Sequence, residues 1–274
     1  MTFKYIVLNL DQESAVEPLV SVCRAIGDSS THLVGVYTLP LFNPPVIAVP
    51  YMPVEVYQEL DASSKKQADR IGALFEESAQ RDNLPIEWYV HQGMTASGTS
   101  AVVEHALTAD LVVTSLASSD KAPWVHRELL GRSSTPLLVV PESLAEVPAF
   151  RKIAVAWDGT SQAARSIRDA MPLLRQAENV TVVCTRGQSR ARPDIIAGSD
   201  VATWLTHHGI PVFLDEHREK QLTLGIAFVD YTRQMSADLI VMGGYGHSPL
   251  YDSLIGGWTD DVLENSTCPV FLSH

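Results

Sequence analysis

The chain has 274 residues, of which 46% are apolar and 19% charged, and its mean hydropathy is +0.05, as in ordinary globular proteins. Its 20 basic and 32 acidic side chains give a formal net charge of −12, which disfavours DNA and anionic membranes as partners. At about 100 to 200 residues per domain, this length predicts two domains.

The N-terminal residues MTFKYIVLNLDQES lack the charged start and the small-residue cleavage site of a signal peptide. The most apolar stretch, residues 33–56, is interrupted by five prolines, whereas a membrane-spanning helix needs about 20 continuous apolar residues. The three cysteines, Cys23, Cys184 and Cys268, are too few and too far apart for a disulfide framework. We therefore expect a cytoplasmic protein whose cysteines are small core residues.

An internal repeat is visible from the first predicted strand onward. Three segments recur in the same order: YIVLNLDQES (5–14) as KIAVAWDGTS (152–161), ADLVVTS (109–115) as ADLIVMG (237–243), and STPLLVV (134–140) as STCPVFLS (266–273). The repeat predicts a tandem duplication, with a first domain at 1–140, a linker at 141–150 and a second domain at 151–274. The offset between the copies changes along the chain. The first copy accordingly has about 19 extra residues in its middle, which we attribute to a proline-rich insertion, and is five residues shorter after ADLVVTS.

Buried strands and amphipathic helices alternate in each copy. In the second copy the apolar runs typical of strands buried on both faces are 153–157, 180–185, 211–215, 238–243 and 269–273. Apolar residues at helical spacing separate them, for example between Ala163 and Leu174. This alternation predicts an α/β fold of two tandem doubly wound domains, each with a five-stranded parallel sheet. Ligands of such folds bind at the carboxyl ends of the strands.

Two features of the second copy lie at such strand ends. Asp158 follows the first strand, where its carboxylate is placed to accept hydrogen bonds from a ribose or a base; the same turn is also a candidate helix N-cap through Thr160 or Ser161. The segment GGYGHSPLYDSLIGGWTDD, residues 243–261, follows the fourth strand. Its glycines at 243, 246, 256 and 257 let a loop backbone approach an anion beside a helix that starts near Thr259.

This combination resembles the universal stress protein family: the opening IAVAWDGT, the ADLIVMG strand, GxxG separated by nine residues from the next G, and the final CPVFL. The resemblance covers nearly all of residues 151–274 and, more weakly, residues 1–140. It implies a Rossmann-like fold of the adenine nucleotide alpha hydrolase type, and ATP or a related adenine nucleotide, with or without Mg²⁺, as a regulatory ligand in stress response. It also implies that two such domains pair, here within one chain through their last strands; a homodimer of chains stays open.

The resemblance also implies roles for individual residues. Asp158 would contact the adenosine, Thr185 would flank the base, and Met242 and Gly243 would line the ribose. The phosphates would be surrounded by Gly246, Gly256, Gly257 and the hydroxyl of Thr259.

The second copy departs from the family pattern in its charges and in one hydroxyl. Gly257 stands where the family usually has Ser or Thr, and no Lys or Arg occurs from Gly243 to His274. Asp260 and Asp261 would repel a phosphate at the helix start. Three arginines at 186–192 could restore positive charge, although a solvated loop is the alternative interpretation.

The first copy keeps Asp11 but lacks the glycines after its fourth strand, although Trp124 aligns with Trp258. We interpret it as a structural partner, or as a binder of something else through its insertion. The histidines considered, among them His207 and His208, suggest no metal site, and no catalytic nucleophile with a base is visible. We therefore expect a nucleotide-binding regulatory protein rather than an enzyme. The alternative is an interaction module of the same fold that has lost nucleotide binding.

Overall fold

The computed structural model describes residues 2–39, 54–92, 99–116, 122–142, 144, 146–185, 198–215, 225–245 and 257–274. The first copy comprises β1 (Tyr5–Asn9), α1 (Glu13–Ile26), β2 (His32–Leu39), α2 (Val54–Gln80), β3 (Ile86–Gln92), α3 (Ser100–Ala106), β4 (Leu111–Ser115), α4 (Ala122–Ser133) and β5 (Leu137–Val140). The second copy comprises β6 (Lys152–Trp157), α5 (Ser161–Asp169), α6 (Met171–Leu174), β7 (Asn179–Cys184), α7 (Ser199–His207), β8 (Val212–Asp215), α8 (Gly225–Gln234), β9 (Leu239–Gly243), α10 (Trp258–Asn265) and β10 (Val270–Ser273).

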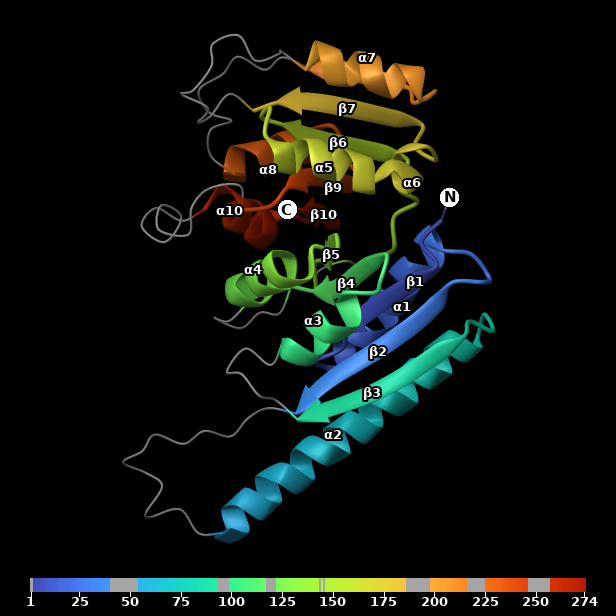
Figure 1. Ribbon diagram of the computed structural model, residues 1–274, viewed down its shortest axis with the longest axis vertical. Helices are drawn as coiled ribbons and strands as arrows, with labels where there is room; N and C mark the ends of the chain where they lie inside the picture. The colour runs from blue at the N-terminus through green and yellow to red at the C-terminus, as the bar shows by residue number, and fades with distance from the viewer. Residues whose placement is uncertain are drawn as a thin grey trace.

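The described strands form one ten-stranded sheet in the order β3-β2-β1-β4-β5-β10-β9-β6-β7-β8 (Figure 1). Within each copy the five strands pair in parallel. The core on one face is built with α1, α2, α5, α6 and α7, and the core on the other with α3, α4, α8 and α10. The predicted α/β fold with five parallel strands per copy is confirmed.

The two copies meet at their last strands. β5 and β10 pair antiparallel, with Leu138 opposite Phe271, as expected for these two strands. Phe271 is fully buried, and its ring centroid lies 6.4 Å from that of Phe3 in the first copy. The hydrophobic core on each face therefore continues across the seam between the copies.

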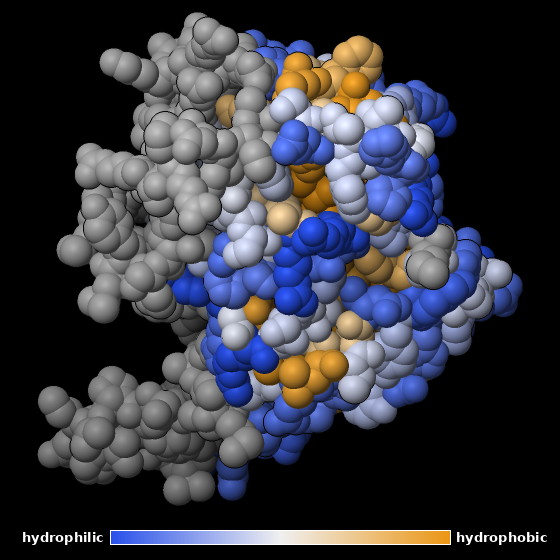
Figure 2. All heavy atoms as spheres, turned by 45° about the horizontal axis from the view of Figure 1, so that its top comes forward, coloured by the Kyte–Doolittle hydropathy of each residue, from blue (hydrophilic) through white to orange (hydrophobic). Residues whose placement is uncertain are grey.

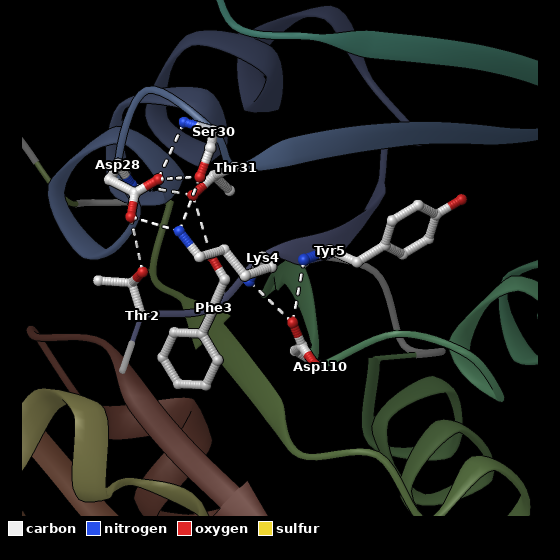
Figure 3. Close-up of polar contacts among 8 residues, drawn as sticks. All are labelled: Thr2, Phe3, Lys4, Tyr5, Asp28, Ser30, Thr31 and Asp110. Atoms are coloured by element: carbon white, nitrogen blue, oxygen red, sulfur yellow. Dashed lines mark hydrogen bonds and ion pairs between the residues drawn. The ribbon is translucent and has the colours of Figure 1, made fainter.

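One aspartate in each copy ties the start of the first strand to the start of the fourth. Asp110 accepts hydrogen bonds through Oδ2 from the backbone amides of Lys4 and Tyr5, at 2.7 and 3.0 Å (Figure 3). Asp238 accepts from the amides of residues 151 and 152, one through each carboxylate oxygen, at 2.8 and 3.0 Å. These are the aspartates of the repeated ADL motif, so the sequence repeat includes a structural contact that recurs.

The extra length of the first copy lies in a helix, and its attribution to the proline-rich insertion was wrong. α2 has 27 residues, whereas α7 at the corresponding place has 9. The segments leading into these helices, 40–53 and 185–198, are equally long by the element bounds. The N-terminal turns of α2 are largely exposed, so they carry little apolar periodicity from which a helix could be predicted.

The surface is mostly hydrophilic on the face shown in Figure 2, with separate hydrophobic patches between the hydrophilic regions. None of the helices in the described ranges is long and apolar enough to cross a bilayer. All three cysteines are free, and Cys23 and Cys184 are buried.

Candidate functional site

The turn after β6 holds Asp158 at the protein surface. Its Oδ1 accepts hydrogen bonds from the backbone amide and the hydroxyl of Thr160, at 2.9 and 2.7 Å. Thr160 in turn accepts from the amide of Ala163 at 3.2 Å and is the N-cap of α5. Gly159 has φ +81°, a left-handed conformation that favours glycine. The N-cap interpretation of this turn is therefore correct for Thr160, and Asp158 orients the cap.

Gly243 ends β9 where the strand comes close to the first turn of α5. A Cβ atom at this position would lie 2.6 Å from the backbone nitrogen of Ala163 and 2.8 Å from atoms of Gln162, closer than real Cβ contacts. The missing side chain thus brings the end of β9 against the helix that Thr160 caps. Asp158 and Gly243, which are far apart in the sequence, consequently lie at one carboxyl edge of the sheet.

The start of α10 supplies the third part of this edge. Gly257 is the N-cap, with φ −69° and ψ 141°, an extended conformation that any residue adopts. Thr259 is 7% exposed, and its hydroxyl oxygen accepts a hydrogen bond from the backbone amide of Tyr245 at 3.4 Å. Helix N-termini carry partial positive charge and unpaired amides, which suit an anion.

A side chain from the first copy reaches this helix start. Arg127 of α4 lies 3.3 Å from Oδ2 of Asp260, with its guanidinium 4.7 Å from the ring centroid of Tyr245. The Tyr245 hydroxyl donates to Oδ1 of Asp260 at 2.9 Å, and burial followed by the Asp260 charge raises the pKa of Tyr245. The Arg127 and Asp260 side chains are only 24% and 17% exposed. The positive charge that the C-terminal sequence lacks at Asp260 is therefore supplied by the other copy.

The other predicted contacts are placed differently. Met242 is fully buried within β9, so its side chain belongs to the core. Thr185 continues the pairing beyond β7, because its amide and its hydroxyl both donate to the carbonyl oxygen of Trp157, at 3.0 and 3.4 Å. The predicted phosphate contacts Gly246 and Gly256 lie outside the described residues, as do the arginines within 186–192.

The corresponding edge of the first copy has a different construction. Residues 116–121 join β4 to α4, whereas 244–257 join β9 to α10. Burial and the neighbouring charge of Glu142 raise the pKa of Asp11, the counterpart of Asp158. The connection is shorter in the first copy, as predicted after ADLVVTS, and the longer α4 makes up part of the difference.

Part of the second copy matches a known protein family. Residues 216–274, which include α8, β9, α10 and β10, match the model of the Universal stress protein family. The predicted resemblance to universal stress proteins is confirmed. No curated protein matches the chain significantly.

Solved universal stress proteins share the fold. One from Archaeoglobus fulgidus DSM 4304 is 14% identical, with a TM-score of 0.70, and the match covers 99% of this chain and 96% of that one. A putative universal stress protein from Pseudomonas aeruginosa UCBPP-PA14 is 12% identical, with a TM-score of 0.61 and coverage of 99% and 93%. A universal stress protein in complex with cAMP is 16% identical, covers 45% of this chain and 97% of its own, and has a TM-score of 0.35. The first two matches show that the fold of universal stress proteins extends over both copies.

Proposed function

We propose that the second copy binds ATP or a related adenine nucleotide as a regulatory ligand in a cytoplasmic stress response, and that the nucleotide is not a substrate for rapid turnover. The observation that supports this most is the convergence of the Asp158 turn, the Gly243 strand end and the N-terminus of α10 at one edge of the sheet. Asp158 would accept hydrogen bonds from the nucleoside, and the amides at the start of α10 would face the phosphates.

Charge balance at α10 supports a phosphate more than the C-terminal sequence alone suggests. Asp260 and Asp261 lie in the first turn of α10, close to the proposed phosphates, and their charges disfavour an anion there. The ion pair with Arg127 offsets the Asp260 charge. In the proposed arrangement the first copy is thus a structural partner that supplies a cation to the site of the second.

The first test is the nucleotide content and stoichiometry of the whole chain. Mass spectrometry of ligand released from freshly purified, denatured protein should detect an adenine nucleotide. Calorimetry with and without Mg²⁺ should give at most one site per chain, because the first copy lacks the glycine loop. Two equivalent sites would contradict the assignment to the second copy.

Asp158→Asn tests the nucleoside side of the site. The amide oxygen of Asn can still accept the two Thr160 hydrogen bonds, but the charged acceptor is lost. A hydrogen bond to a charged group contributes about 1.5 to 3 kcal/mol, so affinity should fall by roughly tenfold or more. Asp11→Asn, the same change in the first copy, is the matched control and should leave the nucleotide affinity unchanged. Equal effects of the two changes would contradict the proposal.

Gly257→Ser tests the phosphate side. The φ of −69° accommodates serine without strain, and the new hydroxyl stands where the family usually has one. Nucleotide affinity should rise by up to roughly tenfold, by the same hydrogen-bond magnitude. Gly131→Ser is the control, because Gly131 lies in α4 with nothing within 4 Å of an added Cβ. A Gly257→Ser protein that binds nucleotide no better than wild type would argue against a phosphate at this position.

The second candidate function is an interaction module that has lost nucleotide binding. It is favoured by hydrogen bonds that already engage two proposed ligand groups: Thr259 accepts from Tyr245, and Asp158 accepts from Thr160. If neither wild type nor Gly257→Ser binds an adenine nucleotide, this second function is the better account.

A further inference from the structure

β3 is a free edge of the ten-stranded sheet. It is the outermost strand of the first copy, and among the described strands it pairs with β2 alone (Figure 1). The amide of Leu33 donates to the carbonyl oxygen of Pro85, so the odd-numbered residues of β3 are the ones that bond to β2. The backbone groups that point away from the sheet are those of Ile86, Trp88, Val90 and Gln92. No described group hydrogen-bonds to them.

The sequence of β3 lacks the usual safeguards of an exposed edge. Natural edge strands avoid open pairing by being short or by carrying Lys or Pro. β3 has seven residues, IEWYVHQ, with neither Lys nor Pro, whereas β8 at the other end of the sheet has only four. Tyr89 and Val90 are 37% and 43% exposed. A long, exposed edge of this kind is a template for another strand.

From this edge we propose that two molecules of the protein form a two-fold symmetric dimer in which β3 of one pairs antiparallel with β3 of the other. The two-fold axis passes beside Tyr89, because Tyr89 is the central residue of Ile86–Gln92 and only this register pairs all seven residues. Trp88 then lies opposite Val90 of the partner subunit, and the two exchange both backbone hydrogen bonds. Antiparallel pairing of two such edges already joins β5 to β10 within the chain.

The side chains of β3 are complementary to themselves in this register. Trp88 packs against Phe75 of α2, with ring centroids 6.0 Å apart, and on that face it meets the apolar Val90 of the partner subunit. On the other face Glu87 lies opposite His91 of the partner subunit, with Cα atoms about 4.5 Å apart. An imidazole that can donate a hydrogen bond thus faces a carboxylate. Because Glu87 is the one Asp, Glu, Lys or Arg residue of β3, no like charges meet.

Contacts within the single chain already orient these two polar side chains. The Tyr89 hydroxyl donates to Oε2 of Glu87 at 2.5 Å. Nε2 of His91 lies 3.0 Å from Nε2 of His105 on α3. Side chains that are held in place before association lose little conformational freedom when the partner arrives.

The helices on β3 leave room for the partner. α2 packs on both β2 and β3, so it lies about half a strand spacing inside β3, whereas the two-fold axis lies about half a spacing outside it. With strands about 4.8 Å apart, the two α2 helices come to lie about 10 Å apart, a distance at which helices pack. α3 packs mainly on β1 and β2, which leaves the other face of β3 open for the two Tyr89 side chains.

The first experiment measures the oligomeric state of the full chain by sedimentation velocity over a series of concentrations. Wild type should form a dimer with twice the 30.0 kDa mass of the chain. Val90→Pro removes an outward amide without touching the bonds to β2, and Val90→Lys places a charge at the edge. Both should weaken dimerisation by roughly tenfold or more. Leu214→Lys, the matched change at an exposed residue of the β8 edge, should have no effect.

A cross-link tests the register. The two Tyr89 residues face each other with Cα atoms about 4.5 Å apart, within the range of a disulfide. Tyr89→Cys should therefore give a covalent dimer under a mild oxidant. Val90→Cys should cross-link much more slowly, because the two Val90 residues are displaced from each other by two positions. Wild type, whose three cysteines are free, is the control for reaction at the native thiols.

Three results would overturn the proposal. The first is a wild-type chain that is monomeric at every concentration, and the second is a dimer that persists in both Val90→Pro and Val90→Lys. The third is a Tyr89→Cys protein that cross-links no faster than Val90→Cys. A dimer that Leu214→Lys dissociates would place the interface at β8 instead. Circular dichroism establishes that each variant is folded, and the cross-link does not depend on the Val90→Pro and Val90→Lys variants.

Discussion

At the scale of single residues, His126 is the buried histidine of the described chain. It lies in α4 with 1% of its surface exposed, and no hydrogen-bond partner reaches its Nδ1. A backbone hydrogen bond with Ser115 favours the protonated ring, but burial outweighs it and lowers the pKa of His126 to about 4. The native state therefore holds a neutral imidazole at neutral pH.

This burial predicts a loss of stability in mild acid. An unfolded histidine has a pKa of about 6.5, so the unfolded chain takes up a proton between pH 6.5 and 4 that the native chain does not. The His126 contribution is complete above pH 6.5 and falls by up to about 3 kcal/mol as the pH drops to 4. Urea unfolding of wild type and His126→Leu at pH 7.5, 6, 5 and 4.5 measures it. The unfolding free energy of wild type should fall relative to that of His126→Leu as the pH drops, and a difference that does not change with pH would contradict the prediction.

The residues of the proposed nucleotide site were predictable only in part. The sequence motif identified Gly243 and Gly257 equally. Only Gly243 is required by packing, because a Cβ there would lie 2.6 Å from the backbone nitrogen of Ala163, whereas Gly257 has an ordinary extended conformation. Arg127 could not be predicted, because it belongs to the other copy and no local spacing links it to Asp260. The family resemblance implied a place beside the ribose for Met242, but the side chain of Met242 is fully buried in the core.

At the scale of elements, α8 and α10 are packed closely through a glycine. A Cβ on Gly225, the first residue of α8, would lie 2.5 Å from Cβ of Asp261 and 2.6 Å from the carbonyl oxygen of Trp258. The ring of Trp258 also packs on Phe228 of α8, with centroids 5.1 Å apart. The position of α10, and with it the proposed phosphate contacts, therefore depends on α8.

Gly225→Ala should destabilise the protein by about 1 to 3 kcal/mol, because the added methyl group forces apart two helices that have no room for it. Gly131→Ala is the matched control. Gly131 is helical and has open space around it, so alanine there should stabilise by about 0.5 to 1 kcal/mol. Urea unfolding at pH 7.5 measures both changes in stability. If both variants are more stable than wild type, the close contact at Gly225 does not exclude a side chain.

Most strands were predictable, and one long helix was not. Strands such as β6 and β9 are continuous buried runs, so their sequence pattern and their packing agree. The N-terminal turns of α2 are solvated. The prediction therefore assigned the extra residues of the first copy to the nearby proline-rich segment and not to a helix. Helix length on an exposed surface is set by few apolar contacts, so the sequence pattern carries little information about it.

At the scale of the whole molecule, the ten-stranded sheet joins the two copies, and we expect them to unfold as one cooperative unit. Phe271 of β10 and Phe3 belong to the same buried cluster, which extends across the seam. The recurring pattern of apolar strands predicted two copies, and the family resemblance implied that they pair through their last strands. The continuity of the core could not be predicted from repeats, since it depends on which side chains meet across the seam.

Phe271→Ala should destabilise both copies together. Removing a buried phenylalanine costs about 3 to 5 kcal/mol, and the shared core distributes that loss over both sides of the seam. Hydrogen exchange followed by mass spectrometry should show faster exchange in β1 as well as in β6 and β9. If only the strands of the second copy lose protection, the two copies unfold independently.

The antiparallel seam between β5 and β10 also changes how the protein responds to dilution. Two separate chains that paired at such an edge would come apart at low concentration, whereas here residues 141–150 connect the partners and make the pairing intramolecular. The tether keeps the effective concentration of each edge at its partner high, whatever the abundance of the protein in the cell. Either half is thereby free to diverge without having to form a matching pair with itself, and a side chain of one half, such as Arg127, can specialise in serving the other.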